Sequence, residues 1–367
     1  MTSTFGIEEE YFLVDAGSGD LVSRAGEVLG RAHDLAGDQV TSELNHCQLE
    51  SNTTTCTDLD EATGQLVGLR RALAEAAEGS AAIPVALGSH PWSSWHDQEV
   101  NTDKEHYRTL VDRYQHVARS QVICGCHVHV AVDELDARIE VMNGVRPWLP
   151  VLLALSANSP WWEGADTGYA SYRTLLWRAW PTAAMPTLLK DFADYERLVG
   201  SLEQVGAIDD ASALYWYVRP SAKLPTLEYR VCDVCLLVED TITIAGVVRA
   251  LTVATLTGAA GAVPTPTVAV LDAALWRAAR YGLEGDLVDP LTVTLQPAAT
   301  VVAHLVDLVS DALHDAGDYQ RVTGGISEIL RRGNGATAQR RALDHFPDPG
   351  GALDGLRAMQ AVDGIAG

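Results

Sequence analysis

The chain has 367 residues, with 26 Lys and Arg against 49 Asp and Glu, which gives a formal net charge of −23 and a pI near 4.7. Such an acidic chain offers no broad cationic surface, so neither nucleic acid nor an anionic membrane is expected as its main partner. Hydrophobic residues make up 47% of the chain and charged residues 20%. This composition supplies a large folded core and excludes disorder as the global state.

The organisation of the chain indicates one folded unit. No Pro/Ser-rich linker, internal repeat or low-complexity block divides it, so a single domain over residues 1–367 is expected. The sequence MTSTFGIEEEYFLVD reaches acidic residues before any apolar run, which argues against a secretory signal. Residues 241–271 are the most apolar stretch, but Arg249 and two prolines interrupt them, so no bilayer span is predicted. A cytoplasmic location is expected.

The six cysteines, at positions 47, 56, 124, 126, 232 and 235, are too dilute for a disulfide scaffold and fit a reducing compartment. Cys232 and Cys235 form a CxxC pattern. The segment around them is typical of a strand, which would send the two thiols to opposite faces. Buried, inert thiols are therefore favoured over a redox or zinc pair.

In chain order, residue patterning predicts strands over 5–14, 40–50, 84–88, 122–132 and 226–236. Apolar spacing of about 3.6 residues predicts helices over 58–79, 102–119, 135–156, 186–204, 237–258, 267–281 and 299–315. Interleaved strands and long helices indicate an α+β or α/β layer with helices packed on a sheet. Residues 157–185 are rich in Gly, Pro and aromatic side chains and are expected to form an irregular functional loop.

Four predicted strands carry polar residues two positions apart, a spacing that places both side chains on one face. The pairs are Glu8 and Glu10, Gln48 and Glu50, His127 and His129, and Glu228 and Arg230. Positions on the other face are mostly apolar. One interpretation is the solvated face of an antiparallel sheet. Because none of these strands has Lys on its polar face, a charged cleft on a sheet backed by helices is favoured.

Converging carboxylates require cations. Two carboxylates about 6 Å apart repel by on the order of 3 kcal/mol at an effective dielectric near 20. Carboxylate-rich ligands with one imidazole suit Mg²⁺ or Mn²⁺ better than zinc. The HVH pattern by itself also occurs in zinc hydrolases, but no other His in the chain has metal-ligand spacing to this pair. The sequence therefore predicts a hard divalent-metal site.

These residues carry a resemblance to a known family. GIEEEYFLVD, ELNHCQLES, GCHVHV, NSPWWEGADTGYASYR, the WRAWP run and RPSAKLPTLEYRVCD occur in this order and together resemble the type 2 glutamate-cysteine ligases, which are carboxylate-amine ligases of the glutamine synthetase-like superfamily. The similarity covers about residues 5–345, which leaves 346–367 as a C-terminal tail. The resemblance implies an α+β fold in which a curved, mostly antiparallel sheet forms a funnel with helices on its outer face.

The resemblance also implies roles for individual residues. The positions that match the metal-binding residues of the family are Glu8, Glu10, Glu43, Glu50, His127 and Glu228. The positions expected to meet phosphates or substrate carboxylates are His129, Arg173, Arg219 and Arg230. Among Glu43, Gln48 and Glu50 the individual ligands stay open, and Gln48 is included with the substrate-binding or nucleotide-binding residues. Trp162, beside Trp161, either belongs to the partial core or forms a wall of an amino-acid pocket.

The expected activity is ATP-dependent ligation of a carboxylate, glutamate, to an amine, cysteine or another amino compound. Mg²⁺ or Mn²⁺ would neutralise the phosphates, and Arg219 and Arg230 would stabilise the migrating phosphoryl group, with Arg173 in a supporting catalytic role. The substrate carboxylate would form an acyl phosphate, and the amine would then displace phosphate. Neither a GxxxxGK[ST] loop nor a GxGxxG turn is present.

Alternatives remain at this point. A metal-dependent hydrolase could use the same Glu/His cleft, and a non-catalytic module could hold Ca²⁺ for structure. The basic segment 331–341, RRGNGATAQRR, is either a solvated helical tail that pairs with acidic surface or a loop that closes over nucleotide. A homodimer is the default expectation for an enzyme of this size.

Overall fold

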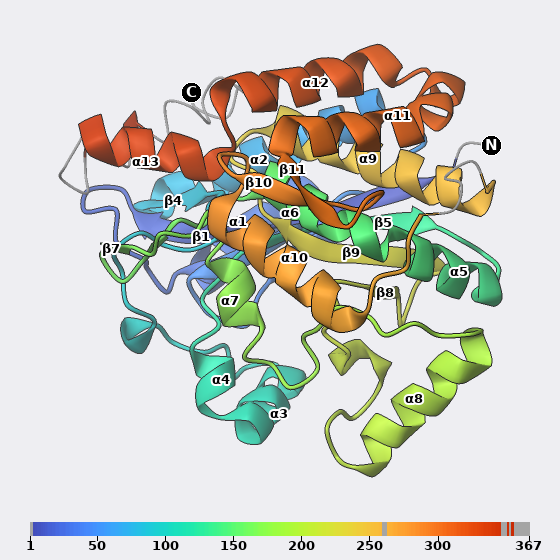
Figure 1. Cartoon of the computed structure of the whole chain (residues 1–367). Helices are drawn as coiled ribbons and strands as arrows, with labels where there is room; N and C mark the ends of the chain where they lie inside the picture. Colours follow the sequence, from blue (N-terminus) through green and yellow to red (C-terminus); the bar gives the residue numbers. More distant parts are fainter. Residues whose placement is uncertain (1–2, 259–262, 346–350, 352–353, 356–367) are drawn as a thin grey trace.

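The computed structural model describes residues 3–258, 263–345, 351 and 354–355 of the chain (Figure 1). Most of the expected tail over 346–367 lies outside these residues. The strands are β1 (Phe5–Asp15), β2 (Val40–Ser42), β3 (Gln48–Asn52), β4 (Ala82–Val85), β5 (Gly125–Ala131), β6 (Trp161–Trp162), β7 (Ala165–Asp166), β8 (Val218–Pro220), β9 (Thr226–Asp233), β10 (Asp286–Asp289) and β11 (Thr294–Pro297).

The α-helices lie between and after these strands. They are α1 (Ala25–Ala36), α2 (Leu59–Ala77), α3 (Glu105–Tyr114), α4 (His116–Arg119), α5 (Leu135–Val145), α6 (Leu149–Ser156), α7 (Arg173–Trp177), α8 (Phe192–Gln204), α9 (Val238–Leu256), α10 (Val268–Tyr281), α11 (Ala298–Ala316), α12 (Tyr319–Arg332) and α13 (Gly335–His345).

One antiparallel sheet organises the molecule. Its strands follow the order β2-β3-β1-β5-β9-β8, and β4 pairs with the C-terminal half of β1. β2 and β8 form the two ends, so the sheet is open. The central strand β1 pairs with β3 on one edge and with β5 on the other. This order brings the expected polar strands β3, β1, β5 and β9 next to one another.

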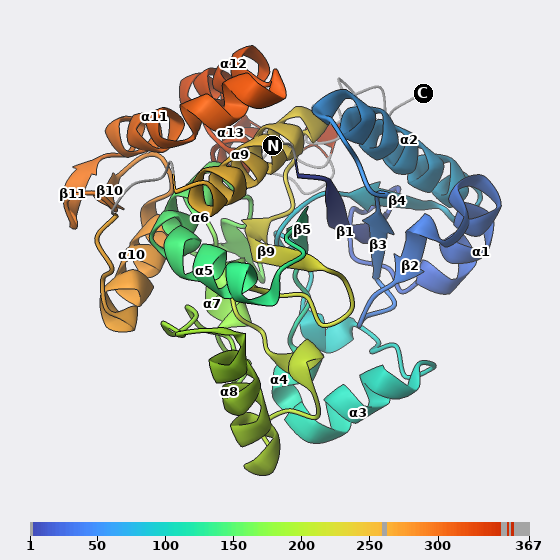
Figure 2. The ribbon, with the colours of Figure 1, turned by 90° about the vertical axis from the view of Figure 1, so that its right-hand side faces the viewer.

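Helices cover one face of the sheet. Figures 1 and 2 show α9, α11 and α12 stacked on one side of it, while α3, α4 and α8 lie on the opposite side. On the helix-covered side the main hydrophobic core joins β5 and β9 to α5, α6, α9 and α11, and a second core joins β1, β3 and β4 to α1 and α2. The predicted α+β fold with an antiparallel sheet and helices on its outer face is thus confirmed.

Local chemistry explains where the expected elements changed. The strand expected over 40–50 is two strands, β2 and β3, joined by a turn that contains Glu43. The helix expected over 135–156 breaks into α5 and α6 at Pro147, which has no N–H to continue the helical hydrogen bonds. The helix expected over 102–119 breaks into α3 and α4 at Gln115, whose φ is +50°.

Some other expected elements differ from the structure, whereas the irregular segment and the lack of a predicted bilayer span agree with it. The helix expected over 186–204 begins only at Phe192, after the N-cap residue Asp191. The helices α1 and α12 and the short strands β8, β10 and β11 were not predicted. Residues 157–185 contain only the short elements β6, β7 and α7, as expected of an irregular segment. Among the described helices, each is too short or too polar to cross a bilayer.

The cysteines are buried and unreactive as predicted, but the strand expected over 226–236 ends at Asp233, so Cys235 lies beyond it and not in one strand with Cys232. All six are free and buried. Burial raises the pKa of Cys232 to about 12 and the pKa of Cys235 well above its usual range, so both thiols stay protonated and unreactive at neutral pH.

Candidate active site

A cleft lies on the face of the sheet away from the main core. It contains a cavity of about 330 Å³ that is bounded by residues of β1, β3, β5 and β9 together with α3 and α7. The register places side chains from neighbouring strands opposite one another. Glu10 pairs with Glu50, Glu8 with His127, and His129 with Glu228. The two-residue spacing read from the sequence therefore does bring these side chains to one face.

Glu10, Glu43 and Glu50 form an acidic cluster. Each offers a carboxylate oxygen, and these oxygens lie within 4.8 Å of one another. Burial, together with the neighbouring Glu10, raises the pKa of Glu43 to about 7. Burial and the negative charges of Glu8 and Glu43 also raise the pKa of Glu50. The acidic cluster therefore carries more negative charge than its surroundings stabilise, and a divalent cation would relieve the repulsion.

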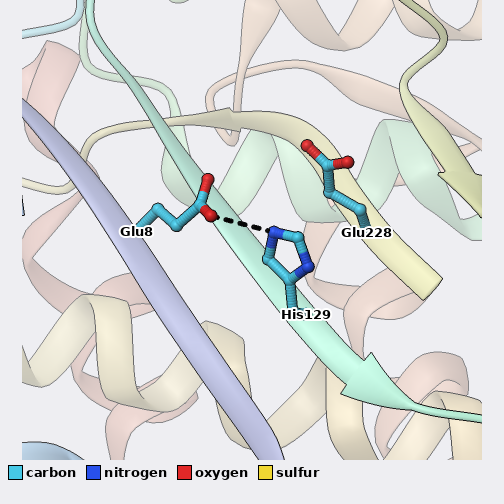
Figure 3. A group of neighbouring side chains, drawn as sticks. All are labelled: Glu8, His129 and Glu228. Atoms are coloured by element: carbon cyan, nitrogen blue, oxygen red, sulfur yellow. Dashed lines mark ion pairs between the residues drawn. The ribbon is translucent and has the colours of Figure 1, made fainter. Parts of the chain in front are cut away.

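Glu8, His129 and Glu228 form a mixed cluster beside it. Their ligand atoms also lie within 4.8 Å of one another, and Figure 3 shows the three side chains converging from β1, β5 and β9. His129 Nε2 lies 3.2 Å from Glu8 Oε1 and has no hydrogen-bond partner of good geometry. The side chains of this cluster therefore point to a common centre.

The charge balance of the mixed cluster differs from that of the acidic cluster. Burial would raise the pKa of Glu8, but the adjacent imidazoles of His127 and His129 outweigh it and hold this pKa well below its usual range. Burial of Glu228 is likewise outweighed by Arg230 and Arg219, which lower its pKa. The mixed cluster therefore stays ionised with cations already beside it.

His127 lies between the two clusters. Its Nδ1 is 3.0 Å from Glu8 Oε2, and its Nε2 is 4.0 Å from Glu10 Oε1. The β5–β9 ladder is irregular here, because Cys126 pairs with Cys232 whereas Val128 pairs with Tyr229. The family resemblance implied that His127 binds the metal and that His129 meets phosphate or substrate, but the geometry puts His129 in the mixed cluster with Glu8 and Glu228. Which imidazole is the ligand stays a prediction.

Two arginines enclose Glu228. Arg219 Nε lies 2.8 Å from Glu228 Oε2, and Arg219 Nη1 donates to the carbonyl oxygens of Ser212 and Leu214. Most donors of Arg219 are therefore already used, which fits a role in holding Glu228. Arg230 Nη1 contacts Glu228 Oε1 as well, but its buried Nε has no partner and is available to a ligand.

Arg173 is the third predicted arginine and also borders the cavity. Its side chain is 3% exposed, and its Nε has no hydrogen-bond partner. The guanidinium centres of Arg173 and Arg230 lie 5.7 and 5.2 Å from the centre of the Trp177 ring. A buried pair of cations with unused donors, held against one aromatic ring, is suited to binding an anionic group.

Two predicted substrate contacts have other surroundings. The Gln48 amide accepts from Asn45 Nδ2 and donates to the Ile123 carbonyl at 2.8 and 2.7 Å, so it braces the turn before β3 although it borders the cavity. Trp162 lies on β6, with its ring 6.1 Å from that of Tyr172, and is not among the residues that line the cavity. Its substrate role stays a prediction without support from this placement.

Aromatic walls of the cavity were missed as site residues. They come from Tyr107, Trp177, Trp180 and Tyr215. Two of them belong to the WRAWP run, whose clustered tryptophans were a usable signal. A second cavity, of about 280 Å³, opens at the other end of the mixed cluster. It is bordered by Glu8 and His129, by the hydroxyl-rich segment 52–55, and by apolar Phe5 and Pro225.

The basic segment 331–341 is helical. Arg331 pairs with Glu328, Arg332 with Asp240, and Arg340 with Asp166 at 2.7 Å. It forms the end of α12 and most of α13. Of the two alternatives for this segment, the arrangement therefore favours a helical segment that pairs with acidic groups and not a loop that closes over nucleotide.

Comparisons with known proteins identify the family of this chain. The model of the glutamate-cysteine ligase family 2 (GCS2) matches residues 4–360. A "Putative glutamate–cysteine ligase 2-2" of Mycolicibacterium vanbaalenii is 41% identical over 98% of this chain and 99% of its own. A "Putative glutamate–cysteine ligase 2" of Rhodopirellula baltica is 38% identical over 92% of each chain.

Solved structures show the same fold at low sequence identity. The crystal structure of a glutamate–cysteine ligase from Francisella tularensis in complex with AMP has a TM-score of 0.72 at 16% identity, covering 99% of this chain and 89% of that one. A bifunctional glutathione synthetase from Pasteurella multocida has a TM-score of 0.70 at 16% identity, covering 98% of this chain and 53% of that one. The family model that matches residues 4–360, together with relatives that are 38–41% identical over more than nine-tenths of the chain, shows that this protein belongs to the glutamate-cysteine ligase family 2.

Proposed function

We propose that this protein is an ATP-dependent ligase that joins the γ-carboxylate of glutamate to an amine, either cysteine or another amino compound. The observation that carries the proposal is the placement of two ligand clusters side by side. Glu8 and Glu10 project from one face of β1 into the mixed cluster and the acidic cluster, respectively. Family membership supports the same activity.

The donor sets fit hard divalent cations. The acidic cluster consists of three carboxylates with the raised pKa values of Glu43 and Glu50, and the mixed cluster adds the unpartnered Nε2 of His129. Oxygen-rich sets of this kind suit Mg²⁺ or Mn²⁺. When bound, such cations would neutralise phosphate charge and so allow an acidic protein to accept a polyanion.

The two cavities suit different parts of the reaction. The cavity beside Phe5, Pro225 and the hydroxyl-rich segment 52–55 combines apolar walls with hydrogen-bonding groups, which suits a nucleotide base and sugar. The cavity beside Arg173 and Arg230 combines fixed cations with aromatic walls, which suits an amino acid. The mixed cluster lies between them, where a γ-phosphate and a substrate carboxylate would meet.

The chain's own residues would act by position and charge. Arg230 has an unused Nε at the cleft and would stabilise charge on the transferring phosphoryl group. Arg219 would hold Glu228 in place through their 2.8 Å contact. Arg173 would bind a carboxylate of the amino acid through its free donor. Attack of the γ-carboxylate on the γ-phosphate of ATP would give an acyl phosphate and release ADP, and attack of the amine on the acyl carbon would then give the amide and free phosphate.

The test is release of phosphate from ATP in the presence of Mg²⁺, glutamate and a panel of amines. Glutamate labelled with ¹⁸O in its γ-carboxylate should transfer one label to the released phosphate, because attack of the amine on the acyl phosphate breaks its C–O bond and the phosphate leaves with one carboxylate oxygen. Mass spectrometry identifies the amide. The Glu10→Gln variant serves as the inactive control. ATP that stays intact across a broad panel of carboxylates and amines would rule out the ligase and leave the hydrolase or the non-catalytic metal module.

A further inference from the structure

Gly125 and Asp233 surround the guanidinium of Arg173. The two residues are direct cross-strand partners at the start of β5 and the end of β9. Partners in an antiparallel ladder present their side chains on the same face of the sheet. Gly125 has no side chain there, and the Arg173 guanidinium fills the free space. A Cβ built on Gly125 would overlap Arg173 Nη2 and lie 2.7 Å from Cζ.

Asp233 holds residue 173 at both ends. Its Oδ1 lies 3.8 Å from Arg173 Nη1. Its Oδ2 accepts from Ser159 Oγ at 2.7 Å, and Ser159 Oγ in turn accepts from the Arg173 backbone N–H at 3.0 Å. Asp233 is fully buried and also accepts from Asn158 N and Ser171 Oγ, at 2.8 and 2.9 Å. Arg173 is therefore fixed through its backbone and its charge.

Gly125 also contacts the acidic cluster. Its N–H donates to Glu10 Oε2 at 2.6 Å. Gly125 thus contacts both the Glu10 carboxylate of the acidic cluster and the guanidinium of Arg173. A methyl group at this position would leave the N–H in place but remove the room for the guanidinium, which is the mobile end of a flexible side chain and would be the group that shifts.

We propose that Gly125 and Asp233 are positioning residues that fix the Arg173 guanidinium for recognition of the carboxylate of the amino-acid substrate. The role in substrate binding rests on the proposed function, whereas the placement of the Arg173 guanidinium against Gly125 and Asp233 follows from the geometry alone. Neither residue needs to touch the substrate. Their effect acts through Arg173, so it should appear in the affinity for the amino acid and not in the affinity for ATP.

The experiment compares wild type with Gly125→Ala in steady-state phosphate release. Gly125→Ala should raise the KM for glutamate about tenfold or more, as expected when a charge-assisted hydrogen bond is misplaced, while the KM for ATP stays within about twofold. In an Arg173→Met background the same Gly125→Ala change should have no further effect on kcat/KM, since residues that act through one group are not additive. A repeated tenfold loss in that background would overturn the proposal.

Two further variants separate positioning from damage to the fold. Asp233→Asn keeps the shape but removes the charge, and it should also raise the KM for glutamate without changing the KM for ATP. Gly144→Ala in α5 places a Cβ 2.6 Å from Thr255 Cγ2, away from the cleft, and should lower the melting temperature with an unchanged KM for glutamate. A wild-type KM in both Gly125→Ala and Asp233→Asn would also overturn the proposal.

Crystal structures of wild type and Gly125→Ala give a readout that does not depend on turnover. The guanidinium of Arg173 should move off residue 125 and away from Asp233 in the variant. A guanidinium that does not move would refute the role of Gly125 and Asp233 in positioning Arg173. If the wild type releases no phosphate with any amino acid, the proposed function is refuted instead. The two crystal structures would still test whether Gly125 and Asp233 position Arg173.

Discussion

Glu9 and Arg70 form a doubly hydrogen-bonded ion pair on the face of β1 opposite to the face that carries Glu8 and Glu10. Arg70 Nε donates to Glu9 Oε2 at 2.9 Å and Nη2 to Oε1 at 2.7 Å, and both side chains are buried. Thr241 Oγ1 donates to the same carboxylate at 2.6 Å. Burial would raise the pKa of Glu9, but Arg70 outweighs it and lowers this pKa. The pair anchors β1 to α2 and α9, so it fixes the strand from which both clusters begin.

Arg70→Met should strongly destabilise the protein. The change leaves the Glu9 carboxylate buried and without its cation, and breaking a buried pair in this way costs about 3–5 kcal/mol. Urea unfolding monitored by circular dichroism measures the loss. Arg197→Met is the matched control, because Arg197 is 66% exposed and pairs with Asp194 on the surface of α8, where an ion pair contributes about 0–1 kcal/mol. Equal losses in the two variants would contradict the anchoring role.

Glu50→Gln should leave the metal-free protein at least as stable as wild type but weaken its stabilisation by metal. Removing one carboxylate from the acidic cluster lessens repulsion, so the metal-free variant should melt at the same temperature as wild type or higher. Mn²⁺ at 100 times its Kd should stabilise wild type by about 2.7 kcal/mol but stabilise the variant far less. Scanning calorimetry with and without Mn²⁺ measures both effects. A variant that gains as much from Mn²⁺ as wild type would exclude Glu50 from the metal site.

Trp177→Leu should weaken binding of the amino acid. The Trp177 ring faces both Arg173 and Arg230, and each cation–π contact contributes roughly 0.5–2 kcal/mol. We expect about a tenfold rise in the KM for glutamate, measured by phosphate release, with only a small change in melting temperature. Trp276→Leu is the control, since Trp276 is 43% exposed on α10. The prediction fails if both variants keep the wild-type KM.

His90 should make stability depend on pH. Burial lowers the pKa of its imidazole from 6.5 to about 4, while Nε2 contacts the Gly19 carbonyl and Nδ1 accepts from Ser93 N, both at 3.0 Å. Below pH 6.5 the unfolded chain binds a proton that the folded protein refuses. Stability is therefore fully present above pH 6.5 and falls by about 3 kcal/mol as the pH drops to 4.

His90→Gln tests this pH dependence, because glutamine has no imidazole to titrate. The difference in unfolding free energy between wild type and variant should shrink as the pH falls from 6.5 to 4. Urea unfolding at several pH values measures it. A difference that stays constant over this range would show that His90 titrates normally.

The sequence by itself determined the composition of the cleft. Polar residues two apart on strands must share a face, because strand side chains alternate, and this rule was enough to group Glu8 with Glu10 and His127 with His129. Apolar residues on the opposite face were enough to place helices behind the sheet. These are local properties that need no knowledge of which strands are neighbours.

Only the tertiary structure decided how the polar residues of the cleft are grouped into the two clusters. The strand order places β1 between β3 and β5, and this pairing assigns Glu8 to one cluster and Glu10 to another. Burial raises the pKa of both Glu43 and Glu228, but the net shifts are opposite because Glu43 lies among other acids whereas Arg230 and Arg219 beside Glu228 outweigh its burial. Gly125 has no side chain that a sequence pattern could single out, and its role appears only when an arginine 48 positions along the chain fills the space that it leaves.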